Sequence, residues 1–306
     1  MSERTQISDE ARIIGFLRYS TVSHKNLRNW RDTRRRTFAD ACAVVFDDGR
    51  MAARSALFKA IALPSLIEQW RSCPSFELAI MISPLLPARW RDDLNAAVAG
   101  LPFVRIVEVP VDLDIKRASR LFAFGNLPDR IRVVTTLRID DDDCLHSGYI
   151  RKISDVSRIE NVGKVYSFSK GAYFGHGKDG KIFILPRNHL RNAQGIAYIA
   201  DVASKHTILT LGGHNKLDQK AEFIVDRRPY SWMRSIHGAA DTRRLQKEVN
   251  LSEVLPLSDH SAMLSGNFPF LDLKSVRRAL DIANAYSGPE SEYSLVVQYS
   301  DDQGQA

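Results

Sequence analysis

Four consecutive aspartates follow an apolar, β-branched segment, and this junction constrains the fold more than any other feature of the chain. Residues 131–139 (IRVVTTLRI) are typical of a buried central β-strand. Four adjacent carboxylates repel one another, so no stable fold requires the run Asp140, Asp141, Asp142 and Asp143. In open α/β sheets, ligands bind at the carboxyl ends of the strands. The junction therefore predicts a ligand site at one edge of a sheet.

The segments before this junction alternate between strand-like and helical patterns. Short apolar runs predict strands and apolar residues every three or four positions predict helices, in the order 12–17, 51–71, 77–83, 88–99, 103–109 and 115–124. Pro64 lies within the first helical segment and is expected to kink it. Strands separated by helices indicate βαβ units, so we expect an α/β fold with a mostly parallel sheet.

After about residue 160 the strand-like segments become short and are separated by glycines, which predicts antiparallel hairpins. The expected strands are residues 164–169, 172–174, 181–185, 207–211 and 222–225. Residues 175–180 (GHGKDG) match the dinucleotide-binding pattern G-x-G-x-x-G, but a strand-like segment follows where that motif needs a helix, so they indicate a hairpin turn. An amphipathic helix is expected at residues 273–286, followed by a polar tail or a further strand at 293–299.

The net positive charge comes from one N-terminal stretch. The chain carries 43 Lys and Arg against 36 Asp and Glu, and without residues 12–36 (the basic stretch) 35 of each remain. Three interpretations stay open: a solvated helix face, docking on anionic lipid head groups, or contact with a diphosphate or an acidic glycan. No nucleic-acid recognition motif accompanies the stretch, so we expect no nucleic-acid partner. Its basic residues are Arg12, Arg18, Lys25, Arg28, Arg31, Arg34, Arg35 and Arg36.

Cysteine content and hydropathy indicate the compartment. Cys42, Cys73 and Cys144 are too few and too scattered for a disulfide framework or a zinc knuckle. No charged-then-apolar leader opens the sequence, and the longest apolar runs are near half of a bilayer span. We therefore expect a cytoplasmic protein, with peripheral contact at the inner membrane surface as an additional option.

The acidic run itself favours a metal–nucleotide site. Clustered carboxylate oxygens suit Mg²⁺ or Mn²⁺, and such ions commonly join one or two carboxylates to a diphosphate. The alternative is a solvated acidic loop or the first turn of a helix. An EF-hand is excluded because the sixth and twelfth positions from Asp140 are Leu145 and Arg151 instead of Gly and Glu.

The junction also carries a family resemblance. Residues 136–145 (TLRIDDDDCL) resemble the T-x-R-[LI]-D-D-D-D-x-L signature of bacterial rhamnosyltransferases, which are glycosyltransferases of the GT-A class. Weaker similarities follow in the same order at residues 15–20 (GFLRYS), 54–69, 83–87 (SPLLP) and 232–238 (WMRSIHG), so the resemblance spans about residues 13–240. Two departures are Tyr19 in place of the usual Phe, and the segment 239–241 (AAD) where an Asn is common.

The resemblance implies an architecture. It indicates a GT-A-like, Rossmann-type mixed sheet with flanking helices, in one glycosyltransferase domain over residues 1–250. Residues 12–145 would form the nucleotide-sugar-binding half and 146–250 the acceptor half. Residues 251–306 would add a helical extension and a polar tail.

The resemblance also implies roles for the acidic run. Asp140 would contact the donor and Asp142 would hold Mn²⁺ or Mg²⁺, while the shifted register, Asp141 with Asp143, stays open. Arg138 lies two residues earlier on the same strand face and is expected to orient Asp140. Family members often add a late histidine ligand, and the candidates are His214 and His237, although an isolated histidine is more often structural.

Further candidates are the residues that follow the first strand or carry a guanidinium group. Arg18 and Ser20 are expected at the same sheet edge as the acidic run, beside the donor diphosphate. The other donor-binding candidates are Arg54, Arg117, Arg120 and Asp141, although most arginines are simply solvated. A general base would be one of four carboxylates in the acceptor half: Asp201, Asp218, Glu222 or Asp226.

The predicted function is metal-dependent transfer of a sugar from a UDP-, dTDP- or GDP-linked donor to a glycan or lipid-linked acceptor. Rhamnose as the sugar rests on the family label alone. Two other classes stay open. One is a metal-dependent nucleotidyl- or phosphotransferase that uses the same acidic edge. The other is a non-enzymatic protein that docks on membranes or anionic polymers through residues 18–36.

Overall fold

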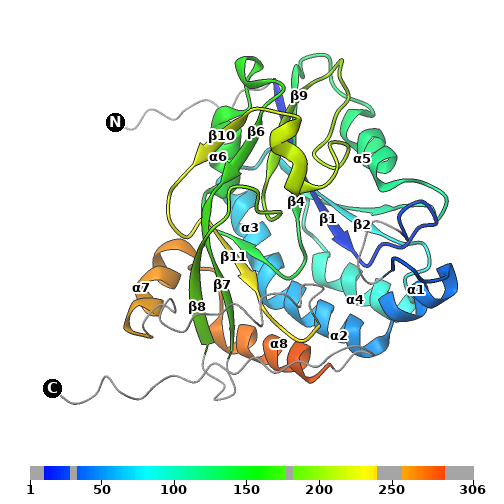
Figure 1. Cartoon of the computed structure of the whole chain (residues 1–306), viewed down its shortest axis with the longest axis vertical. Coiled ribbons are helices and arrows are strands. Elements are labelled where there is room, and N and C mark those ends of the chain that lie inside the picture. Colours follow the sequence, from blue (N-terminus) through cyan, green and yellow to red (C-terminus); the bar gives the residue numbers. More distant parts are fainter. Residues whose placement is uncertain (1–9, 28–32, 177–181, 240–256, 287–306) are drawn as a thin grey trace.

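Two β-sheets form the frame of the molecule, with helices packed against them (Figure 1). The computed structural model describes residues 10–27, 33–176, 182–239 and 257–286. The larger sheet has seven strands in the order β10–β6–β9–β4–β1–β2–β3, and the smaller has four in the order β5–β11–β7–β8. The α/β class with a mixed sheet and flanking helices is thereby confirmed.

The larger sheet is mixed, with β4 at its centre. Pairing is parallel between β1 and β2, β2 and β3, β1 and β4, and β6 and β10, whereas β9 is antiparallel to both β4 and β6. Its strands are β1 (Ala11–Tyr19), β2 (Phe76–Ile82), β3 (Val104–Glu108), β4 (Val133–Ile139), β6 (Val165–Phe168), β9 (Ala197–Asp201) and β10 (Phe223–Asp226). The predicted segment 131–139 is therefore the central strand, as its β-branched composition indicates.

The chain reverses its direction of travel across the sheet between β1 and β4. It proceeds from β1 outward to β2 and β3, and then returns to place β4 on the other side of β1. Such a switch point leaves a crevice at the carboxyl ends of the two strands, where α/β proteins bind ligands. The acidic run follows β4 directly at this crevice.

Helices cover both faces of the larger sheet. One face packs its Ile13, Leu17 and Ile80 side chains against helices before β3 and after β4, whereas Phe16 and Met81 face α5 on the other side. The helices of the first half are α1 (Phe38–Val45), α2 (Asp48–Leu57), α3 (Leu63–Ser72), α4 (Ala88–Val98) and α5 (Ile115–Phe124). Those of the second half are α6 (Tyr149–Val156), the 3-10 turns η3 (Ile159–Asn161) and η4 (His214–Gln219), and α7 (Leu257–Asn267) and α8 (Leu273–Ala285).

The helix predicted over residues 51–71 is interrupted one turn before its proline. A π-helical segment, η2 (Phe58–Ala62), separates α2 from α3, and the Leu63 N–H donates to the Phe58 carbonyl. Pro64 has no N–H to continue the α-helical ladder, so the widened turn absorbs the mismatch and α3 begins with proline in its first turn.

The smaller sheet brings distant segments of the second half beside the acidic run. Its strands are β5 (Cys144–Leu145), β7 (Lys170–His176), β8 (Ile182–Asn188) and β11 (Trp232–Ser235). The β7–β8 pair is antiparallel, as predicted for a hairpin, and β11 pairs with β5 and β7. Because β5 follows the four aspartates immediately, its pairing with β11 places the segment after Trp232 next to them.

One strand prediction in the second half is wrong, and one strand that is present as predicted pairs differently from what we expected. Residues 207–211 form turns, because the Thr207 carbonyl and side chain accept hydrogen bonds from the chain three and four residues on. The segment 164–169 forms β6 in the larger sheet instead of part of a hairpin. The strand expected at 293–299 lies outside the described residues, as does most of the turn at 175–180.

Helix α8 packs between α2 of the first half and the smaller sheet of the second half. Figure 1 shows α8 running beside α2, and their apolar side chains form one cluster that includes Leu57, Val276 and Leu280. In addition, the Asn284 side chain accepts a hydrogen bond from the Gly238 N–H at 2.9 Å. The extension predicted over residues 251–306 thus contributes a helix that holds the chain just after β11.

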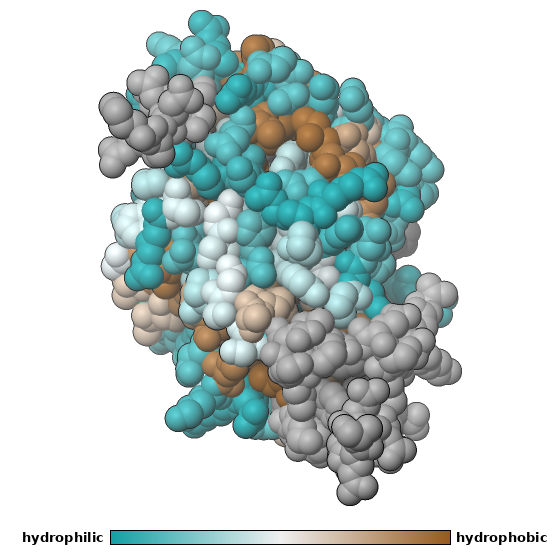
Figure 2. Space-filling view, turned by 90° about the vertical axis from the view of Figure 1, so that its left-hand side faces the viewer, coloured by the Kyte–Doolittle hydropathy of each residue, from teal (hydrophilic) through white to brown (hydrophobic). Residues whose placement is uncertain are grey.

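The surface on the side of β10, α6 and α7 is mainly hydrophilic, and hydrophobic residues reach it in separate groups (Figure 2). Within the described part of the chain, every helix is too short or too polar to cross a membrane.

Candidate active site

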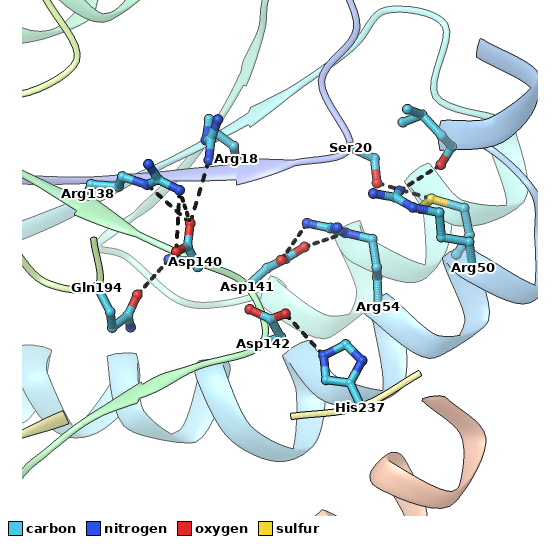
Figure 3. A network of polar contacts seen from close by, with 12 residues as sticks. Arg18, Ser20, Arg50, Arg54, Arg138, Asp140, Asp141, Asp142, Gln194 and His237 are labelled. Carbon is cyan, nitrogen blue, oxygen red and sulfur yellow. Dashed lines mark hydrogen bonds and ion pairs between the residues drawn. The ribbon is translucent and has the colours of Figure 1, made fainter. Parts of the chain in front are cut away.

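A cleft of about 530 Å³ opens at the strand switch point. Its floor comes from the ends of β1 and β4, and its walls come from α2, α5 and the chain around residues 193–217. Arg18 approaches from β1, and Asp140, Asp141 and Asp142 enter from the end of β4 (Figure 3). The carboxyl edge predicted from the sequence is therefore the floor of a cleft.

Asp140 is held by guanidinium groups. Arg138 Nη2 lies 3.1 Å and Arg18 Nη2 3.7 Å from Asp140 Oδ1, and the Asp140 N–H donates to Gln194 Oε1 at 2.8 Å. Burial on its own would raise the pKa of Asp140, but Arg138, Arg18 and Arg234 outweigh it and hold the pKa well below its usual range. Asp140 is therefore ionised at neutral pH. The predicted bracing by Arg138 is present.

Asp141 is committed to Arg54. The two side chains form a bidentate pair, with Arg54 Nε and Nη2 at 2.8 and 2.5 Å from the carboxylate oxygens (Figure 3). The Asp141 side chain is only 3% exposed, and burial raises its pKa to about 6 although Arg54 lowers it. The pair fastens the acidic run to α2, so Arg54 serves the site by holding Asp141.

Asp142 faces His237 from the segment after β11. His237 Nε2 lies 3.1 Å from Asp142 Oδ2, while His237 Nδ1 is buried without a hydrogen-bond partner among the described residues. Asp142 is one-quarter exposed to the cleft, in contrast to the buried Asp143. The predicted combination of Asp142 with His237 is thus present as a contact.

Asp143 points away from the cleft and fixes β11. Its Oδ1 accepts a hydrogen bond from the Ser235 N–H at 2.9 Å, and Arg234 lies 3.9 Å from its Oδ2. Burial and the neighbouring Asp142 raise the pKa of Asp143 well above its usual range. The Asp141 and Asp143 side chains are almost fully buried, whereas those of Asp140 and Asp142 are partly exposed, so burial favours Asp140 and Asp142 as the ligand-facing pair.

Helix α3 clamps the chain just after the acidic run. Ser65 Oγ accepts from the Leu145 N–H at 2.9 Å and donates to the Leu145 carbonyl at 3.1 Å. Gln69 Nε2 donates to the His146 carbonyl at 2.9 Å, and Gln69 Oε1 accepts from the Ile150 N–H at 3.0 Å. These buried contacts give Ser65 and Gln69 a shared role in residues 63–69 (LPSLIEQ), within the segment 54–69 that carries part of the family resemblance.

The remaining predicted residues divide into two groups. Ser20 lines the cleft in a left-handed conformation (φ 53°), and His214 lines it beside Arg138 and Asp140. Burial, together with the Arg138 charge, lowers the pKa of His214 to about 4, so His214 is neutral at pH 7. By contrast, Arg117 and Arg120 are exposed on α5 and do not line the cleft.

The basic stretch is not one surface. Arg12 lies at the start of β1, where it pairs with Glu77 at 2.7 Å, far along the strand from the cleft. Arg18 turns toward Asp140, whereas Arg34 and Arg35 are exposed to solvent. Arg28 and Arg31 lie outside the described residues. Strand geometry therefore assigns different environments to residues that the charge count grouped together.

Several residues of the cleft are additional to those predicted. Lys116 lines it from the same helix as Arg117, one position round the helix. Arg234 and Ser235 lie at the unspecified positions of the W-x-x-x-I-H-G segment, which was the available signal for them. Gln194 carried no signal, because its role depends on a long-range bond to the Asp140 backbone.

The four carboxylates considered as bases lie in different places. Asp201 pairs in register with Val133 at the amino end of β4, which is the opposite edge of the sheet. Asp226 bonds to Tyr166 and Arg228, and Glu222 lines neither cleft nor neighbouring cavity. Asp218 lines a cavity of about 380 Å³ that adjoins the cleft.

Comparison with known proteins identifies the family. The sequence model of the family described as "Putative rhamnosyl transferase" matches residues 12–249. The chain belongs to this family. The match extends over both halves of the cleft, so the acidic run, the α3 clamp and the segment with His237 are all within the rhamnosyl transferase region.

Other comparisons add little to this assignment. No curated protein matches the chain. A solved structure titled "Putative Glucose-1-Phosphate Thymidylyltransferase" from Bacillus anthracis, in complex with a sucrose, is 12% identical with a TM-score of 0.35, covering 78% of this chain and 96% of its own. At that score the likeness supports no functional argument.

Proposed function

We propose that this rhamnosyl transferase family member is a divalent-cation-dependent glycosyltransferase of the GT-A class. It would transfer a sugar, rhamnose by the family description, from a nucleotide-sugar to a hydroxyl group of a glycan or lipid-linked acceptor. The observation that carries the proposal is the Asp142–His237 pair, 3.1 Å apart at the strand switch point. Anionic and cationic groups meet there at a cleft large enough for a nucleotide-sugar.

The residues fit a divalent cation that is completed by the donor. Adjacent ligands of an octahedral Mg²⁺ or Mn²⁺ lie about 3 Å apart, which matches the separation of Asp142 Oδ2 and His237 Nε2. The described residues contain no group of three His, Cys, Asp or Glu arranged for a metal. Two protein ligands are typical where diphosphate oxygens and waters supply the others. When bound, the cation would neutralise charge on the diphosphate leaving group.

The chain's own residues supply the rest of the donor site. Arg18 and Lys116 line the cleft and favour an anionic diphosphate, while Arg138 keeps the Asp140 carboxylate ionised and oriented. In the transfer, the acceptor oxygen bonds to the anomeric carbon and the bond from that carbon to the diphosphate oxygen breaks. The electron pair leaves with the diphosphate, and the acceptor proton passes to a base. We assign this base to Asp218 because, of the four carboxylates considered, it lines the cavity beside the cleft.

Ligand-dependent thermal unfolding tests the proposal. UDP, dTDP and GDP, and their sugar conjugates, are added to the full chain with and without Mn²⁺. A ligand at 100 times its dissociation constant stabilises a protein by about 2.7 kcal/mol. We expect Mn²⁺-dependent stabilisation by one nucleotide series, and its loss in Asp142→Asn and His237→Gln. Asp129→Asn, at an exposed position away from the cleft, is the matched control.

Two results would count against the proposal. The first is nucleotide binding that is equal in wild type, Asp142→Asn and His237→Gln. The second is Mn²⁺-dependent stabilisation by the matching nucleoside triphosphate, added in the same assay, that exceeds the stabilisation by the diphosphate and the nucleotide-sugar, which would favour a nucleotidyltransferase instead.

A further inference from the structure

A second cavity adjoins the cleft. It measures about 380 Å³, within the range of small-molecule sites, and shares Ala193, His214 and Arg234 with the cleft. Its own walls come from the end of β8, the loop after it, and η4. A molecule in this cavity would lie directly beside the donor end marked by Arg138 and Asp140.

The loop between the cavity and the cleft is hydrogen-bonded to the backbone of Arg138, which lies two residues before the acidic run. The Gly195 N–H donates to the Arg138 carbonyl at 2.8 Å, and the Arg138 N–H donates to the Ile196 carbonyl at 3.1 Å. Asn192 Nδ2 in turn donates to the Gln194 carbonyl at 3.2 Å. The wall of the second cavity is therefore fixed to the same backbone that positions Asp140.

The lining is rich in groups that both donate and accept hydrogen bonds. Asn188, Asn192 and Asn215 contribute amide groups, and His189 contributes an imidazole whose Nε2 lies 3.1 Å from the Tyr173 hydroxyl. Each sugar hydroxyl also donates and accepts, so amides and imidazoles match it better than a purely cationic or apolar lining would. The cavity thus has the chemistry of a carbohydrate site.

Charges in the cavity are balanced internally. Arg191 Nη1 lies 2.9 Å from Asp218 Oδ2 and also donates to the Asn215 carbonyl at 2.8 Å, so the cation and the carboxylate offset each other. Burial, followed by Arg234 and Arg187, lowers the pKa of His189, which keeps that imidazole neutral. Arg234 faces the Asp143 carboxylate at 3.9 Å. The charges of Asp140 and Asp142 act on Arg234 as well. Among the described residues of this lining, each charged side chain is therefore offset by an opposite charge, and an anionic or cationic ligand would find no uncompensated partner.

We propose that the second cavity binds an uncharged sugar ring of the acceptor, with Arg191, Asp218 and the three asparagines as its hydrogen-bonding groups. This proposal rests on the proposed function, because it takes the cleft as the donor site. It places the acceptor hydroxyl beside His214, where the two cavities meet.

Titration of the full chain by NMR in the presence of Mn²⁺ and the stabilising nucleoside diphosphate tests the proposal. The probes are methyl α-L-rhamnopyranoside and methyl α-D-glucopyranoside as neutral sugars, glucuronate as an anionic one and glucosamine as a cationic one. We expect saturable binding of at least one neutral glycoside. Arg191→Gln and Asp218→Asn should each weaken it about tenfold, the effect of about 1.4 kcal/mol.

The controls separate this proposal from the one on which it rests. Arg158→Gln changes an exposed arginine outside both cavities and should bind the glycoside as wild type does. Nucleotide binding should persist in Arg191→Gln and Asp218→Asn. Nucleotide binding without any saturable glycoside binding would overturn the second cavity's role alone, as would glucuronate or glucosamine binding tenfold tighter than the neutral sugars. Absence of nucleotide binding in wild type would overturn the proposed function itself.

Discussion

The clamp formed by Gln69 is expected to be one of the most stabilising polar contacts of the fold. Gln69→Leu keeps the side-chain volume similar but removes both hydrogen bonds, to the His146 carbonyl and the Ile150 N–H. Both Gln69 and Ile150 are fully buried, so water cannot replace the lost partners without a shift of the chain. A buried polar group left unpaired costs about 1–3 kcal/mol.

Two orphaned groups therefore place the loss at about 2–6 kcal/mol, and we expect about 3 kcal/mol because the segment after the acidic run can move slightly. Urea unfolding of wild type and Gln69→Leu at pH 7.5 measures the difference, provided that the m-value is unchanged. Glu68→Gln is the matched control, since Glu68 is half-buried one position away and pairs loosely with Arg71 at 4.0 Å. Its change should stay within about 0.5 kcal/mol.

The neighbouring Ser65 provides a second check on the same reasoning. Ser65→Ala should also destabilise, but the double variant with Gln69→Leu should lose less than the sum, because both residues hold one segment and the first loss lets it relax. A free energy of unfolding for Gln69→Leu within 0.5 kcal/mol of wild type would refute the idea that α3 fixes the acidic run. Full additivity of the two losses of unfolding free energy would refute the idea that Ser65 and Gln69 hold the same segment.

Three further predictions concern buried contacts elsewhere. Arg54→Leu should lower the free energy of unfolding by about 3–5 kcal/mol, because it leaves the buried Asp141 carboxylate without its partner. Adding Asp141→Asn should recover part of this loss, which a double-mutant cycle with urea unfolding measures. Strict additivity of the two changes would contradict the reasoning. Burial lowers the pKa of His146 to about 4, so between pH 6.5 and 4 the unfolded chain binds a proton that the folded chain does not. The free energy of unfolding should therefore fall by up to about 3 kcal/mol as the pH drops over this range. His146→Gln should flatten this part of the profile of unfolding free energy against pH, and an unchanged slope would count against the reasoning. Gly171→Ala would bring a methyl group to 2.1 Å from the buried Trp232 ring, so thermal unfolding should show a loss of stability of at least about 1–3 kcal/mol. A melting temperature equal to that of wild type would show instead that the strand moves to make room for the methyl group.

The sequence predicted the features that depend on neighbouring residues, but it did not predict those that depend on pairing between distant segments. The strand at residues 131–139 and its acidic end were predictable because β-branching and a change to charge are visible in one window. The contact between Asp142 and His237 joins residues 95 positions apart, so only the family resemblance suggested it. The pairing of β11 with β5 brings these two residues together, and no pattern in residues 232–235 (WMRS) predicts that this strand pairs with β5.

Helix phase explains why the arginines of α5 do not line the cleft, although the sequence suggested them for the donor site. The sequence offers Arg117 and Arg120 as cations near the cleft, but Ile115, Ala118 and Ala123 form the buried face of α5 and turn both arginines outward. Lys116 lies at the border of that face and lines the cleft instead. A shift of one residue around the helix decides whether a side chain lines the cleft. Which residues face the cleft depends on how the helix packs on the sheet, and α5 packs against Phe16 and Met81.

The four aspartates show how a run of like charges becomes a specific site. Each carboxylate meets a different group, so the repulsion that the sequence suggests is offset pair by pair: Arg138 and Arg18 at Asp140, Arg54 at Asp141, His237 at Asp142, and the Ser235 N–H at Asp143. The turn that follows β4 leaves Asp141 and Asp143 buried, while Asp140 and Asp142 stay partly accessible. The buried pair tethers the run to α2 through Arg54 and to β11 through the Ser235 N–H. A chain with only Asp140 and Asp142 would keep the ligand-facing charges but lose the anchors that hold them in register.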